Sequence, residues 1–129
     1  MPKVNLNVSL NNGHLEVDQA GNGTQIGRGE VATISWHLTT AKGAFNELDA
    51  SNRGFAWITT PPPEGVFTDL KLLLHNEEIQ ITDNNTDPGG VSSAGTWIYQ
   101  LWATINDIEY STIATLPPAT STNPTIKNL

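Results

Sequence analysis

Cysteine is absent from this chain of 129 residues. Its absence excludes disulfide bonds, cysteine-ligated zinc, iron–sulfur clusters and thiol catalysis. Basic residues are scarce, because six lysines and arginines stand against 13 aspartates and glutamates, which gives a net charge of −7. This balance opposes binding to nucleic-acid phosphates and to anionic lipids, so we expect neither a nucleic acid nor a membrane as a partner.

Long apolar runs and catalytic motifs are missing as well. No stretch approaches the roughly 20 apolar residues of a membrane span, and the N-terminus lacks the apolar centre of a signal peptide, which favours a cytoplasmic location. The chain has no Gly-x-Ser-x-Gly elbow and no phosphate-binding glycine loop. Its one adjacent acidic pair, Glu77 and Glu78, falls in an expected turn. We therefore expect no enzyme, and no cofactor apart from the calcium considered below.

Alternation of apolar and polar residues dominates the chain and predicts β-strands. The dipeptide Asn12-Gly13 marks a hairpin tip, because both residues tolerate positive φ, and it places Leu10 opposite Leu15. The same reasoning puts a tip at Asn106 and Asp107, with Ile105 opposite Ile108. In both hairpins the apolar residues of the paired strands then share one face, which supports these registers.

Two further features come from the same pattern. A third hairpin is expected with its tip at Asn76 and Glu77, which would pair Leu72 with Ile81. In residues 30–39 the alternation turns Trp36 toward the core and His37 toward solvent. About eight strands are expected in all, at 4–10, 14–19, 30–39, 54–59, 68–75, 78–83, 96–105 and 108–116.

The predicted fold class is all-β, because no helix is long enough to cover a sheet. A two-sheet antiparallel β-sandwich buries such alternating strands, with a closed barrel as the alternative. Residues 1–116 form the single expected domain. Residues 117–129 form a tail rich in proline, threonine and asparagine, which is either loose or pinned to the body by Ile126.

The stretch AGTWIYQLWATI resembles bacterial immunoglobulin-like domains, and the resemblance covers residues 83–116 together with Trp36. In that group a small residue introduces an aromatic one and an alternating strand, as Gly95 and Trp97 do here. The chain departs from the pattern in two ways, because it lacks the immunoglobulin cysteines and has Trp97 where a corner tyrosine is expected. The resemblance implies an immunoglobulin-like sandwich and carries no activity with it.

The stretch TDNNTDPGG at 82–90 is the one candidate metal site. Asp83, Asn85 and Asp87 place side-chain oxygens on alternate positions, as the first half of a calcium-binding loop does. The pattern then breaks at Pro88, where such a loop has glycine, and at Ala94, where it has glutamate. Two readings stay open: a calcium site, or a connection between strands whose Asp and Asn side chains bond the local backbone.

An apolar patch is expected on the outward face of residues 96–105. Ile98 and Trp102 would form it with Ile113 from the neighbouring strand, and exposed patches of this kind often mark interfaces. The tail or residues 41–53 could cover it, or it could contact a protein, a second copy of the chain or a sugar ring.

The leading functional prediction is a non-catalytic binding or structural module acting through protein–protein contacts, including self-association. The alternative is a carbohydrate- or calcium-linked binding domain that uses the 83–90 loop and Trp102.

Overall fold

The computed structural model describes residues 3–11, 13–18, 24–40, 42–48, 54–58, 60–112 and 124–129. They form strands and a single short 3-10 turn, and none of their helices could span a membrane. The elements are β1 (Lys3–Asn11), β2 (His14–Val17), β3 (Thr24–Ile26), β4 (Val31–Leu38), β5 (Gly43–Phe45), β6 (Phe55–Trp57), β7 (Phe67–Leu73), β8 (Glu78–Asn84), η1 (Pro88–Gly90), β9 (Gly95–Ile105), β10 (Ile108–Ser111) and β11 (Thr125–Asn128).

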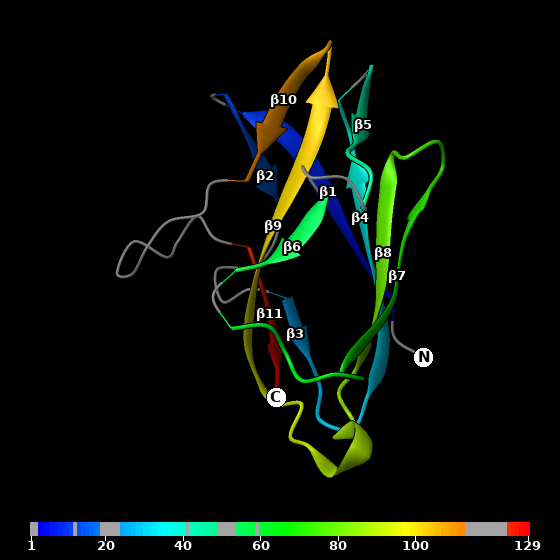
Figure 1. Cartoon of the computed structure of the whole chain (residues 1–129), viewed down its shortest axis with the longest axis vertical. Helices are drawn as coiled ribbons and strands as arrows, with labels where there is room; N and C mark the ends of the chain where they lie inside the picture. The colour runs from blue at the N-terminus through cyan, green and yellow to red at the C-terminus, as the bar shows by residue number, and fades with distance from the viewer. Residues whose placement is uncertain are drawn as a thin grey trace.

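The strands form two packed sheets (Figure 1). The first has the order β2-β1-β4-β8-β7, and the second has the order β10-β9-β11-β3, with β5 and β6 also paired to β9. The predicted all-β, sandwich-like arrangement is thus confirmed. Two pairs, β1 with β4 and β11 with β3, are parallel. The sheets are therefore mixed, and the expectation of antiparallel pairing throughout is wrong, because alternation fixes the buried face of a strand and not the direction of its neighbour.

Two of the three predicted hairpin registers are confirmed. β1 and β2 pair with Leu10 opposite Leu15, and β9 and β10 pair with Ile105 opposite Ile108. At the second tip, residues 106 and 107 have φ values of 51° and 66°. Left-handed backbone at both central positions is what a two-residue hairpin turn requires.

The β7–β8 hairpin differs from the prediction. Leu72 pairs with Ile79 rather than Ile81, so the tip contains four residues. Residues 74–76 are all left-handed, with φ between 53° and 66°, a conformation that costs L-residues about 1–2 kcal/mol each. The Phe45 N–H donates to the Asn76 carbonyl oxygen at 2.7 Å. A tertiary contact to β5 therefore helps to hold a turn that the local sequence does not favour.

Aromatic side chains join the two sheets at the centre of the core. Trp36 of β4 is fully buried, and its Nε1 donates a hydrogen bond to the Tyr99 hydroxyl of β9 at 2.8 Å. Phe55 of β6 stacks on Tyr99 with ring centroids 5.4 Å apart. Burial raises the pKa of the Tyr99 hydroxyl well above its usual range. The predicted inward orientation of Trp36 is confirmed.

The C-terminal residues belong to the body of the fold. β11 lies between β9 and β3, and the side chain of Ile126 is fully buried. Of the two alternatives for the tail, pinning by Ile126 is the one observed. β11 also faces the end of β8, which brings the C-terminal strand next to the predicted calcium loop.

Candidate functional site

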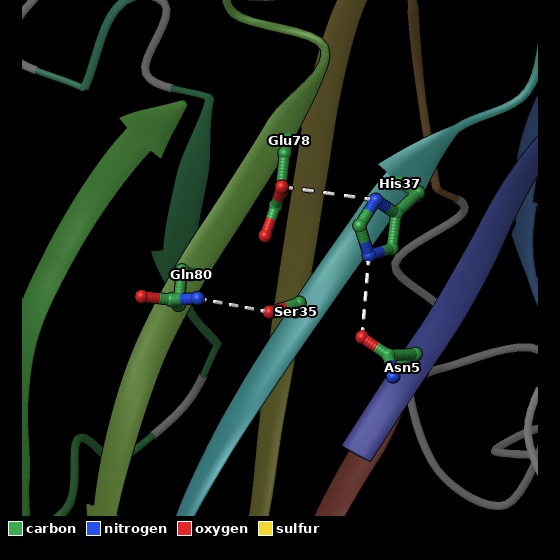
Figure 2. Close-up of polar contacts among 5 residues, drawn as sticks. All are labelled: Asn5, Ser35, His37, Glu78 and Gln80. Carbon is green, nitrogen blue, oxygen red and sulfur yellow. Dashed lines mark hydrogen bonds and ion pairs between the residues drawn. The ribbon is translucent and has the colours of Figure 1, made fainter. Parts of the chain in front are cut away.

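A group of polar side chains lies on the first sheet, on the face away from the core (Figure 2). The strand registers explain why they meet. The parallel β1–β4 pairing places Asn5 beside Ser35, and the antiparallel β4–β8 pairing places Ser35 opposite Gln80 and His37 opposite Glu78. We call these five residues the His37 cluster.

His37 is the centre of the cluster. Its Nε2 lies 3.3 Å from Asn5 Oδ1, and its Nδ1 lies 3.8 Å from Glu78 Oε1. Each ring nitrogen thus faces a side-chain oxygen of a neighbouring strand. The imidazole of β4 lies between groups from its two neighbouring strands, β1 and β8.

Glu78 is unusually well buried for a charged residue on the outer face of a sheet. Its side chain is only 9% exposed, while that of His37 is 35% exposed. In the described part of the chain, His37 is the one ion-pair partner recorded for this carboxylate, and it carries charge only when its ring is protonated. A carboxylate withdrawn from water requires compensating partners. With Nδ1 of His37 and Oε1 of Glu78 3.8 Å apart, their contact is longer than a hydrogen bond.

The geometry of Ser35 bears on the chemistry of the cluster. Its hydroxyl is buried and accepts a hydrogen bond from Gln80 Nε2 at 3.2 Å. A serine nucleophile would need its hydroxyl against a general base, whereas the nitrogens of His37 face Asn5 and Glu78. The arrangement is suited to directional hydrogen bonding rather than to attack by Ser35.

The three predicted calcium ligands lie at the opposite end of β8, and all of them bond to the protein itself. Asp83 Oδ1 accepts from Asn128 Nδ2 at 3.0 Å. Asn85 Oδ1 accepts from Ser93 Oγ at 2.7 Å, and Asp87 Oδ1 accepts from the Ser93 N–H at 2.9 Å. Over the described ranges, no three His, Cys, Asp or Glu side chains come together as a candidate metal site.

Asn85 also fastens two other segments to this network. Its Nδ2 donates to the carbonyl oxygens of Ile26, Gly27 and Leu129 at 3.1, 2.9 and 3.3 Å. Asp87 bonds Ser93 within its own loop, as a local strand connection would, whereas Asn85 joins the loop to segments that are distant in the sequence. Alternate polar residues in this loop have a structural use that involves no metal.

The two acids of the loop differ in their electrostatics. Burial raises the pKa of Asp83 to about 6, and the hydrogen bond from Asn128 opposes that rise. Hydrogen bonds from Ser93 lower the pKa of Asp87 below its usual value. The carboxyl of Asp83 therefore keeps its proton up to about pH 6, whereas that of Asp87 loses its proton more readily than an ordinary aspartate.

Calcium binding can be tested directly. We expect isothermal titration calorimetry with millimolar calcium to show no saturable heat, because the oxygens at 85 and 87 already accept hydrogen bonds. Thermal unfolding followed by circular dichroism should likewise give the same midpoint with and without calcium. A saturable heat that is present in the native chain and lost in Asp87→Asn would contradict this expectation.

The predicted apolar patch is only partly visible. Ile98 and Trp102 are half-buried on the outward side of β9, and Ile113 lies outside the described residues. Gln100 stands between them on the strand and donates to the Thr112 carbonyl oxygen at 3.0 Å. Along β9 the two apolar side chains are thus separated by a polar one, and the patch with Ile113 stays a prediction.

Sequence reasoning did not single out the His37 cluster. It placed His37 outward but assigned it no partner, because the cluster depends on the parallel β1–β4 register. The available signal was the run of polar residues on the outward positions of three strands, such as Asn5, Ser35 and Gln80. That signal marks a polar face without showing which strands adjoin.

Comparisons with known proteins leave the functional argument to this geometry. No protein-family model matches the chain, and no curated protein matches its sequence.

Proposed function

We propose that the chain is a non-catalytic, immunoglobulin-like binding module of bacterial type that acts through protein–protein contacts, with the His37 cluster in its contact surface. The observation that carries this proposal is Glu78, a nearly buried carboxylate on an outer sheet face with His37 as its recorded partner. Hydrogen-bonding side chains fixed by three strands are already ordered before binding, which lowers the entropic cost of association.

The geometry indicates the chemistry of the partner. One oxygen of Glu78 faces His37, and Figure 2 shows the other pointing away from the ring. An ionised carboxylate only accepts hydrogen bonds, so the partner surface must present donors such as arginine, lysine or backbone N–H groups. The net charge of −7 favours approach of a basic partner and disfavours a second, equally acidic copy.

The proposal is tested with an arginine-rich peptide as the probe. We expect its NMR titration to shift amide signals of β1, β4 and β8, and Glu78→Gln to weaken binding by tenfold or more. A hydrogen bond to a charged group contributes roughly 1.5–3 kcal/mol, which is the physical basis of that loss.

Glu64→Gln is the matched control, because Glu64 is exposed and its replacement changes the net charge equally. Equal weakening by the two variants would mean that the peptide responds to net charge alone. That result, or shifts confined to other strands, would contradict a contact surface at the His37 cluster.

A further inference from the structure

We propose that Asp83 and Asn128 form a proton-operated latch that holds the C-terminal strand β11 against the first sheet. Asp83 belongs to β8 in the first sheet, and Asn128 belongs to β11 in the second. Both side chains are buried between the sheets. The latch is thus a polar contact across an otherwise apolar core.

The hydrogen bonds fix how the amide of Asn128 is oriented. Its Nδ2 donates to Asp83 Oδ1 at 3.0 Å and to the Ser93 carbonyl oxygen at 3.0 Å. Both of these atoms are acceptors, so the nitrogen side of the amide must face them. The amide oxygen is then the group left over.

Two buried acceptors in this pair lack a donor. Among the described residues, neither Asp83 Oδ2 nor Asn128 Oδ1 has a hydrogen-bond partner. A buried acceptor without a partner destabilises the fold, and more so when it carries charge. A proton on Oδ2 of Asp83 removes the charge and turns one of these unpaired acceptors into a donor. Burial also raises the pKa of Asp83, which favours the same protonated form of its carboxyl.

Within the described ranges no other charged group substitutes for that proton, since the neighbouring elements place their charges in solvent. β4 carries no acid or base between residues 31 and 36. The exposed charges on the other adjoining elements are Asp69 and Lys71 of β7, Lys127 of β11, Asp87 of the 85–93 segment, and Arg28 and Glu30 of the β3–β4 connection. None of them forms a recorded contact with Asp83, whose pKa is governed by burial and by Asn128.

Further hydrogen bonds next to the Asp83–Asn128 contact hold the end of β11 in place. Beyond Asn128, the Leu129 N–H donates to the Ile26 carbonyl oxygen at 3.0 Å, and the Leu129 carbonyl oxygen accepts from Asn85. Opening of β11 would expose Asp83 to water, where its carboxyl ionises freely. Rising pH therefore favours the opened strand, and a proton on Asp83 favours the closed one.

Hydrogen exchange measured by mass spectrometry on peptides covering residues 124–129 tests the latch in the intact chain. After correction for intrinsic exchange rates, we expect protection of β11 to fall about tenfold between pH 5 and pH 8, from the pKa of about 6 in the folded chain and about 4 in the opened one. Asp83→Asn should abolish the fall, because the new amide keeps the acceptor and gains a permanent donor.

Asp69→Asn removes an exposed acid on the adjoining strand and should behave as the native chain does. Protection of β11 that is independent of pH in the native chain would overturn the latch, as would the same fall in Asp83→Asn. Should Asp83→Asn fail to fold, carbon-13 NMR of the native chain decides between the outcomes. A carboxyl midpoint near pH 6 for Asp83 supports the latch, and one near pH 4 overturns it.

Discussion

Replacing Trp36 by alanine lowers the free energy of unfolding by about 4 kcal/mol, because a fully buried tryptophan leaves both a cavity and lost apolar burial. The indole contacts Phe55 and Tyr99 with ring centroids 5.4 and 5.1 Å apart, so no single neighbour can fill the space. The loss would be measured by urea denaturation followed by circular dichroism.

Two further variants make the Trp36 result specific. Tyr99→Phe keeps the ring and removes the acceptor of the Trp36 Nε1 hydrogen bond, so we expect a smaller loss of about 1–3 kcal/mol for the buried N–H left unpaired. Trp102→Ala removes a half-buried indole of the same size. If Trp102→Ala destabilises the chain as much as Trp36→Ala, the central aromatic group does not have the role assigned to it.

The free energy of unfolding falls by about 2.5 kcal/mol between pH 4 and pH 8 through Asp83 alone. The pKa of this group is about 6 in the folded chain and about 4 in the unfolded chain. The folded state therefore binds the proton more tightly, so its advantage is full below the unfolded pKa and disappears as pH rises through the folded one. The stability that a proton confers here is lost toward alkaline pH.

The contribution of Asp83 is isolated by comparing the free energies of unfolding of the native chain and of a variant without this carboxyl. Urea denaturation of the native chain and of Asp83→Asn at several pH values gives that difference. We expect Asp83→Asn to gain on the native chain from pH 4 to about pH 7 and to keep a constant advantage above that pH. A constant difference across the range would show that Asp83 titrates normally in the folded chain.

The buried faces of the strands were predictable from the sequence because a one-residue slip reverses every side chain. Leu10 and Leu15 could share a face in only one register, and the same holds for Ile105 and Ile108, although Ile108 itself is exposed. Trp36 followed from the same rule, and its burial is observed. Local alternation and turn chemistry carry this information, and both are visible in short stretches of sequence.

The neighbours of each strand were not predictable in the same way. Nothing in the alternation of β1 says that it pairs in parallel with β4, and the β7–β8 tip depends on a contact from Phe45. The His37 cluster required the first of these facts. The polar spacing of the 83–90 loop was equally ambiguous, because it cannot show whether its oxygens converge on an ion or bond separately to Ser93 and Asn128.

The position of β11 has a consequence for how the chain is made. Thr24 of β3 pairs with Ile126 of β11, which follows about 100 residues later in the chain. β3 can therefore form this pairing only after those residues have been synthesised. During synthesis the second sheet can close only after residues 125–128 leave the ribosome. Until then the edge of β9 at residues 95–98 lies open. Such late, distant pairing slows folding and exposes an unpaired edge, so we expect newly made chains to be prone to aggregation until the last strand docks.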